Sequence, residues 1–199
     1  MRKVLFFGDS NTYGCDPDGG HSGRRFPEEV RWTGILKKKL EGKWLVGEDG
    51  LNGRCIPEMK YETEALEESL RRNEPLDLFA VMLGTNDYLS RPHPDPDGVG
   101  KKLGAMLDRV RGLTEAEILV IAPPQLDFSG DRFYRPFSTT DGRLSESERA
   151  AAAQAGAGFL DAASWNLEVS GEDHIHLTAK GHRMFAERML LYFEQKDNG

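Results

Sequence analysis

Short apolar runs alternate along this chain with longer segments in which apolar residues recur every three or four positions. The apolar runs predict five strands, at residues 3–7, 43–47, 75–83, 117–122 and 158–162. The segments between and after them predict helices, at residues 27–40, 59–73, 99–112, 145–155 and 177–194. The run at 75–83 is almost continuously apolar, as a central strand of a parallel sheet should be. This alternation predicts an α/β protein of three layers, with helices on both faces of a parallel sheet.

The first predicted strand ends abruptly in a small polar turn, Gly8-Asp9-Ser10-Asn11. Ligands bind at the carboxyl ends of the strands in open parallel sheets, so this turn places the hydroxyl of Ser10 where chemistry is expected. A serine just past a strand is also a common N-cap of the following helix, and the turn alone does not decide between these roles. As a nucleophile, Ser10 would need a base to remove its proton.

A candidate base lies near the other end of the chain, where His176 follows Asp173 by three residues. This spacing lets the Asp173 carboxylate reach Nδ1 of the imidazole, which leaves Nε2 for the serine hydroxyl. His174 lacks that spacing, so we expect it to face solvent or to brace the loop. We expect the surface or the rim of the site for two other histidines, His21 and His182.

Four short motifs occur in the order of the invariant blocks of the SGNH (GDSL-type) hydrolases: Gly8-Asp9-Ser10, Gly53, Gly84-Thr85-Asn86-Asp87 and Asp173-x-x-His176. The chain therefore resembles that family over nearly its whole length. The segments 26–34 and 82–87 are similar to the bacterial arylesterase/acyltransferase branch. One position departs from the commoner pattern, because Asn11 stands where the family usually has leucine. That residue places a polar side chain beside the serine.

The resemblance implies a flavodoxin-like sheet of five strands in the order 2-1-3-4-5. It also implies that Ser10, Asp173 and His176 are catalytic, and that an oxyanion hole is formed by the N–H groups of Ser10 and Gly53 and the side-chain amide of Asn86. The residue types fit these roles, because glycine lets the backbone approach a ligand and asparagine offers uncharged N–H donors. Taken separately, Asn52-Gly53 is typical of an ordinary turn and Asn86-Asp87 of a side chain that caps a loop.

The resemblance implies a serine esterase for short acyl esters, from acetyl to butyryl, with aryl or alkyl alcohols and with acyl transfer as a further reaction. It implies no organic cofactor and no metal. We expect side chains of the acyl or alcohol pocket at Asn11, Tyr13, Arg54 and Tyr134, whereas Trp32 is expected in the core. Two alternatives stay open. The aromatic segment 128–137 would suit a carbohydrate O-acetyl esterase. A catalytically silent flavodoxin-like binding module is the other alternative, although it would not need all four of Ser10, Asn86, Asp173 and His176.

Composition limits the number of domains, the classes of partner and the cellular compartment that we expect. The 199 residues suit a single domain, 1–199, and 33 acidic against 26 basic residues give a net charge of −7. No basic run indicates nucleic acid or an anionic membrane as a partner, and no apolar run approaches the ~20 residues of a membrane span. We expect no signal peptide before the first strand, and a cytoplasmic protein whose Cys15 and Cys55 are free thiols. The expected partner is a small ester, and homo-oligomerisation is left open.

Overall fold

The computed structural model describes residues 1–22 and 24–198. Its sheet contains five parallel strands in the order β2-β1-β3-β4-β5, which confirms the expected fold class. The strands are β1 (Arg2–Gly8), β2 (Trp44–Gly50), β3 (Leu78–Met82), β4 (Glu117–Ala122) and β5 (Gly158–Asp161). The helices are α1 (Ser10–Tyr13), α2 (Trp32–Lys39), α3 (Lys60–Asn73), α4 (Thr85–Leu89), α5 (Pro96–Arg111), α6 (Arg143–Gln154) and α7 (Ala179–Asn198). Short 3₁₀ turns occur at Pro17–Ser22, Arg135–Phe137 and Ala162–Trp165.

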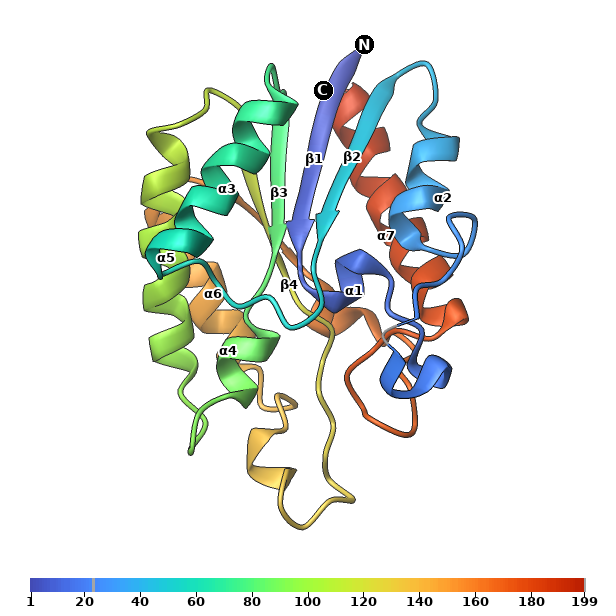
Figure 1. Ribbon diagram of the computed structural model, residues 1–199, viewed down its shortest axis with the longest axis vertical. Coiled ribbons are helices and arrows are strands. Elements are labelled where there is room, and N and C mark those ends of the chain that lie inside the picture. The colour runs from blue at the N-terminus through green and yellow to red at the C-terminus, as the bar shows by residue number, and fades with distance from the viewer. Residues whose placement is uncertain (23, 199) are drawn as a thin grey trace.

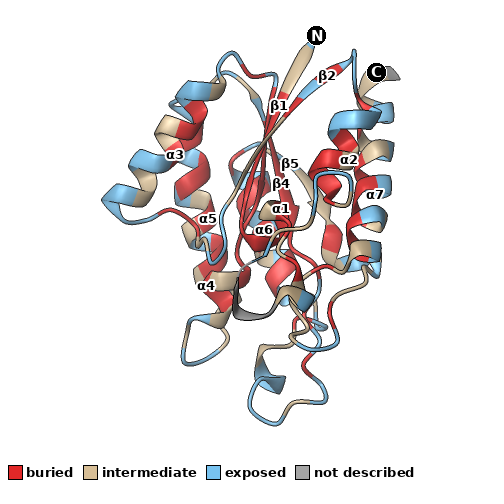
Figure 2. Cartoon of the chain, turned by 45° about the vertical axis from the view of Figure 1, so that its right-hand side comes forward, coloured by how far each residue is buried: buried red, intermediate tan, exposed pale blue. Residues whose placement is uncertain are grey.

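The sheet separates two apolar layers. Helices α3, α5 and α6 cover one face, and α2 and α7 cover the other (Figure 1). Alternate residues of β1 enter the two layers, because successive side chains of a strand point to opposite faces: Leu5 packs on the α3 side and Phe6 on the α7 side. Figure 2 shows the buried surfaces of the helices turned toward the sheet. Trp32 lies in the α7 layer with 1% of its surface exposed and its ring 4.7 Å from that of Phe6, which confirms its expected core role.

Two elements differ from their predicted bounds because arginine side chains bond to groups that are distant in the sequence. The helix predicted at 27–40 begins only at Trp32. Arg31 adopts an extended backbone conformation and donates to the carbonyl of Phe26 and to Glu48 on β2, so residues 27–31 form a separate turn. The strand predicted at 43–47 continues to Gly50. Glu48 and Asp49 remain in the strand because the guanidinium groups of Arg31 and Arg54 pair with their carboxylates.

The segment 84–97, between the predicted strand at 75–83 and the predicted helix at 99–112, contains the short helix α4 and the start of α5. Helix α5 begins at Pro96, because the Asp95 side chain accepts from the N–H of Gly98 at 2.9 Å and proline suits the first turn. The remaining elements lie within a few residues of their predictions, with α7 extending to Asn198. None of the described helices is long and apolar enough to cross a bilayer.

The carboxyl ends of all strands lie at one edge of the sheet, and the chain termini lie at the opposite edge (Figure 1). Helices α1 and α4 and the loops that follow β2, β4 and β5 gather at the carboxyl edge (Figure 1). This arrangement brings together the four polar motifs, although they are far apart in the sequence.

Candidate active site

Ser10 is the first residue of α1, directly after the end of β1. Asp9 caps this short helix, because its Oδ1 accepts from the N–H of Asn11 at 2.9 Å. Burial raises the pKa of the Asp9 carboxyl to about 6, partly offset by that hydrogen bond and by electrostatic interaction with His176 and Arg54. A side chain at Gly8 would collide with Oγ1 of Thr12, so glycine is what lets the helix start this close to the strand. Asp9 rather than Ser10 is therefore the cap, and the Ser10 hydroxyl is left for another partner.

That partner is His176. Its Nε2 lies 2.9 Å from Oγ of Ser10, and its Nδ1 lies 2.7 Å from Oδ2 of Asp173. The other carboxylate oxygen of Asp173 accepts from the backbone N–H groups of Ile175 and His176, at 2.8 and 3.0 Å. Burial raises the pKa of Asp173, but the hydrogen bonds from the His176 ring and from the two N–H groups outweigh it and leave the pKa below its ordinary value. The three side chains form one continuous hydrogen-bonded chain.

The other two motifs meet beside this chain. Gly53 has a φ of +74°, a left-handed conformation that favours glycine. The Asn86 side chain donates to the backbone carbonyl of Arg54 at 3.0 Å, so the asparagine is fixed against the residue that follows Gly53. Asp87 accepts from the N–H of Ile56 at 2.8 Å and so braces the loop after β2. The loop after β2 and the start of α4 are thus held together by two hydrogen bonds.

The residues expected to line a substrate pocket take different positions. Asn11 was expected to line the substrate pocket, but only 3% of its surface is exposed. Its amide nitrogen and oxygen both bond to backbone groups, so the side chain is not free to contact a substrate. The guanidinium of Arg54 also points inward. It lies 4.0 Å from the centre of the Phe7 ring and donates to the carbonyl of Gly8 and to Asp49. Arg54 therefore ties the Gly53 loop to the end of β1, because its five donors can satisfy several acceptors at once.

The aromatic candidates remain at the surface. Tyr13 is partly buried with the guanidinium of Arg25 over its ring at 4.5 Å, and Tyr134 is 55% exposed. Tyr134 packs against Phe128, whose ring centre lies 6.0 Å from that of His174. The long segment between β4 and α6 is held by hydrogen bonds such as that from the N–H of Leu126 to Thr139 at 2.9 Å. It therefore forms an ordered wall next to the His176 loop.

The expectation for His182 was wrong. Its side chain is fully buried under α2, where Nδ1 accepts from the N–H of Trp32 at 3.4 Å. Burial is the main cause that lowers the pKa of His182 to about 4, followed by the nearby positive charge of Arg31. A neutral imidazole is therefore part of the core. His174 is half-buried, and its backbone N–H donates to the backbone carbonyl of Ser170. The side chain of His21 lies outside the described part of the structure.

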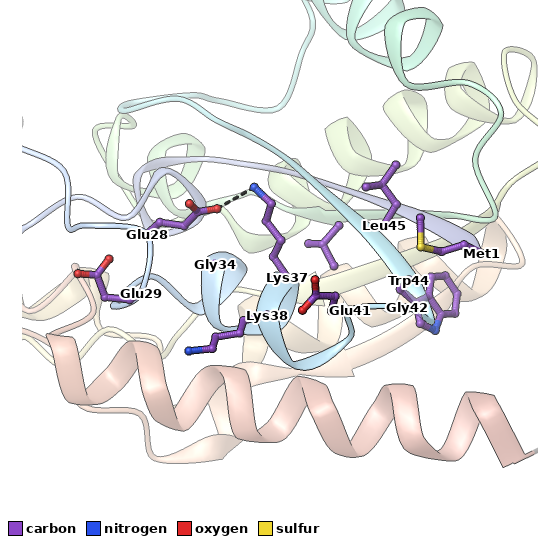
Figure 3. Close-up of a pocket in the computed structure, with 11 residues that line it drawn as sticks. Met1, Glu28, Glu29, Gly34, Lys37, Lys38, Glu41, Gly42, Trp44 and Leu45 are labelled. Carbon is purple, nitrogen blue, oxygen red and sulfur yellow. Dashed lines mark hydrogen bonds and ion pairs between the residues drawn. The ribbon is translucent and has the colours of Figure 1, made fainter.

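Both cysteines are free thiols, as expected. Cys55 lies in a pocket of about 280 Å³ next to Gly53, between the loop after β2 and the start of α3. Leu51 and Tyr61 line the same pocket, so apolar and aromatic groups dominate its walls. A second pocket of about 510 Å³ lies between α2 and the first half of β2, away from the carboxyl ends of the strands (Figure 3). Its charged Lys37 and Glu28 bond to each other, and it contains none of the candidate site residues.

Glu148 on α6 was not among the predicted site residues. Its side chain is nevertheless fully buried behind the site, against Gly84. Burial raises its pKa well above the ordinary value, and the negative charges of Asp161, Asp87 and Asp9 raise it further. Burial therefore favours the neutral form of Glu148 in the folded protein. The sequence carried a weak signal, because Glu148 is three residues before Ala151 and four before Ala152 on the buried stripe of α6.

We expect Glu148→Gln to flatten the pH dependence of stability. The unfolded protein releases the Glu148 proton above its ordinary pKa while the folded protein retains it, so wild-type stability falls as pH rises between the two pKa values. The slope from this one group is up to about 1.4 kcal/mol per pH unit. Urea unfolding from pH 4 to 9 would measure it. A variant that lost stability with pH as steeply as the wild type would contradict the assignment, and Glu146→Gln on the same helix is the control.

A model of GDSL-like lipases and acylhydrolases matches residues 6–184 of this chain. The chain belongs to the GDSL-like lipase/acylhydrolase family. Among solved structures, Est24, a carbohydrate acetylesterase from Sinorhizobium meliloti, is 28% identical with a TM-score of 0.83 over 98% of this chain and 99% of that one. The native aryl esterase of M. smegmatis is 27% identical with a TM-score of 0.82, again over 98% and 99% of the two chains. No curated protein sequence matches this chain.

Membership of this family, together with similarity to esterases of known structure, makes the chain a carboxylic ester hydrolase with the SGNH hydrolase fold. Both structures are aligned over almost their whole length, so the likeness is not limited to the sheet. The carboxyl edge, where the four motifs meet, is accordingly the candidate active site of this hydrolase.

Proposed function

We propose that the hydrolase is a serine esterase in which Ser10 is the nucleophile, His176 the general base and Asp173 the residue that orients the imidazole. The observation that carries the proposal is the continuous chain of hydrogen bonds from Ser10 Oγ through His176 to Asp173. It supplies the two requirements of an activated serine, a base within hydrogen-bond distance and a third group that fixes that base. Asp9 is buried and caps α1, which supports Asp173 rather than Asp9 as the partner of His176.

In the proposed reaction, Ser10 Oγ attacks the ester carbonyl while His176 Nε2 takes its proton. The tetrahedral intermediate collapses as the bond to the alcohol oxygen breaks and the imidazolium gives its proton to that oxygen. Water then attacks the acyl-enzyme, His176 again accepts a proton, and the carboxylic acid leaves with the serine restored. An alcohol or a peroxide in place of water would turn hydrolysis into acyl transfer by the same steps.

Three donors are proposed to stabilise the oxyanion. The N–H of Ser10 begins a helix and so has no partner within it. The N–H of Gly53 belongs to a turn with a φ of +74°, where a Cβ added to the glycine would meet no atom within 4 Å. One N–H of the Asn86 amide is bonded to the carbonyl of Arg54, which fixes the amide plane and leaves its second N–H available. Donors fixed in advance are worth more than mobile ones, because they do not reorganise as charge develops.

Asn86→Ala is expected to lower kcat for p-nitrophenyl acetate by about 10²–10³-fold, the usual cost of one oxyanion donor. The matched control is Asn73→Ala at the end of α3, whose amide also donates to a backbone carbonyl but lies at the far edge of the sheet. Steady-state kinetics with both variants, after a check of thermal unfolding, would make the comparison. Loss of kcat in the control as large as in Asn86→Ala would contradict a specific role.

The proposed substrates are esters of short acyl chains with aryl or alkyl alcohols. The pocket of about 280 Å³ beside Gly53 supports this size, because it adjoins a proposed oxyanion donor and has apolar walls. The similarity to an aryl esterase supports the same class. Hydrolysis of p-nitrophenyl esters from two to twelve acyl carbons tests the limit. We expect kcat/KM to be highest at two to four carbons, and a maximum at eight or more would overturn the short-acyl assignment.

Labelling with a fluorophosphonate tests the mechanism separately from specificity. This reagent reacts with an activated serine hydroxyl, so mass spectrometry of the digested protein should find the adduct on the peptide that contains Ser10. A silent binding module would give no adduct at pH 8. An adduct on another serine would overturn the assignment of the nucleophile.

A second candidate function is deacetylation of carbohydrates. Phe133 and Tyr134 expose 81% and 55% of their surfaces on the ordered segment beside the His176 loop, and exposed rings suit the apolar face of a sugar. Est24 is described as a carbohydrate acetylesterase. Comparing kcat/KM for acetylated xylose and for p-nitrophenyl acetate, with wild type and Phe133→Ala, separates the two. A loss confined to the sugar substrate would favour this candidate.

A further inference from the structure

The side chain of Asn11 connects the helix of the nucleophile to the loop of the general base. Its Nδ2 donates to the backbone carbonyl of Ile175 at 3.1 Å, and its Oδ1 accepts from the backbone N–H of Leu177 at 2.9 Å. These two peptide groups lie on either side of His176. Because Asn11 is 3% exposed, water has little access to compete for either bond.

Both ends of this connection are anchored. The N–H of Asn11 donates to Asp9, and its carbonyl accepts from Nε1 of the buried Trp32 at 2.9 Å. On the other side, Leu177 is fully buried in the apolar layer under α7. A displacement of the base loop relative to α1 would therefore have to break the bonds of the Asn11 amide.

We propose that Asn11 is a positioning residue for the reaction, and that its side-chain amide holds the His176 loop at the distance from Ser10 that proton transfer requires. The inference rests on the proposed serine esterase mechanism. Ser10 and His176 are 166 residues apart in the sequence, so no local structure fixes the 2.9 Å between Oγ and Nε2. Errors of about 1 Å in such a geometry cost about 10²-fold in rate.

An asparagine is chemically suited to this position. Its amide presents one donor and one acceptor, the complement of the carbonyl of Ile175 and the N–H of Leu177. Leucine would leave both backbone groups without this partner in a buried place, so a chain with leucine would need another arrangement of the base loop. Aspartate would keep an acceptor for Leu177 but place a second oxygen against the carbonyl of Ile175.

The test compares Asn11→Leu and Asn11→Ala with Thr12→Val. Thr12 is buried on the same short helix, and within the described residues its hydroxyl bonds to no protein group, so Thr12→Val changes a neighbouring buried side chain without touching the base loop. We expect kcat for p-nitrophenyl acetate to fall by about 10- to 100-fold in both Asn11 variants, with KM within about twofold of the wild type. Thr12→Val should retain wild-type kcat. The rate of fluorophosphonate labelling should fall in parallel with kcat.

Thermal unfolding separates positioning from loss of folding, because kcat is compared only in variants that remain folded at the assay temperature. If Leu and Ala do not fold, Asn11→Asp supplies the nearly isosteric variant, which should lose kcat in the same way. A folded Asn11 variant with kcat within about threefold of the wild type would overturn the inference. Wild-type enzyme that does not label at Ser10 would instead overturn the proposed mechanism.

Discussion

Ser10→Ala should lower kcat for p-nitrophenyl acetate by about 10⁴- to 10⁶-fold, the range measured when a serine hydrolase loses its nucleophile. The substitution removes the atom that is proposed to attack the carbonyl, while it leaves His176, Asp173 and the proposed oxyanion donors in place. Residual turnover would come from water bound in the same site. The variant should fold normally, because Asp9 rather than Ser10 caps α1.

Ser145→Ala is the matched control for that measurement. Ser145 is also a buried serine whose hydroxyl bonds to one side chain, in this case Asp161 at 2.8 Å, but it lies on α6. Its loss should leave kcat unchanged. Near-normal turnover by Ser10→Ala, with the substitution verified by mass spectrometry of the assayed sample, would refute the mechanism.

The sheet was predictable because each strand carries its signal locally. The apolar runs ending at Phe7 and Leu83 needed no distant partner to be recognised, and the strand order followed from the family resemblance. The continuation of β2 through Glu48 and Asp49 was not predictable in the same way. Two adjacent carboxylates after an apolar run predict the end of a strand. The strand continues because the guanidinium groups of Arg31 and Arg54 neutralise these carboxylates, and both arginines are distant from the apolar run or follow it in the sequence.

The burial of His182 shows a signal that was present and not used. This residue precedes Phe185, Ala186 and Met189 by three, four and seven positions, so it belongs to the buried stripe of α7. Histidine is often found at the surface, and that preference outweighed the periodicity. The period of the helix was the better guide.

At the candidate site, the motifs could be predicted from the sequence but the hydrogen bonds between them could not. The four motifs were recognisable because they occur together in the fixed order of the family, whereas the contacts that connect them were not predicted. Asn11 and Arg54 are polar residues beside catalytic motifs, so they were expected to contact substrate. Their partners are backbone groups such as the carbonyls of Ile175 and Gly8, which carry no sequence signal at all. Roles that depend on backbone acceptors from distant segments cannot be found by residue type.

Asp173→Asn should lower kcat by about 10⁴-fold, for a reason that this geometry makes specific. Oδ1 of Asp173 accepts two backbone N–H groups, and Oδ2 accepts from Nδ1 of His176. In asparagine, the single oxygen should remain with the two N–H donors, which turns the NH₂ group toward Nδ1. The imidazole would then carry its proton on Nε2, point that N–H at Ser10 and be unable to accept the hydroxyl proton.

The pH profile distinguishes this explanation from a general loss of structure. The negative charge of Asp173 stabilises the imidazolium, so its removal should move the acidic limb of kcat/KM to lower pH. Glu172→Gln is the matched control, because it removes an exposed charge one residue away without touching the imidazole. Its limb and kcat should stay near those of the wild type. Equal losses in the two variants would mean that net charge of the loop, and not the tautomer of His176, limits the reaction.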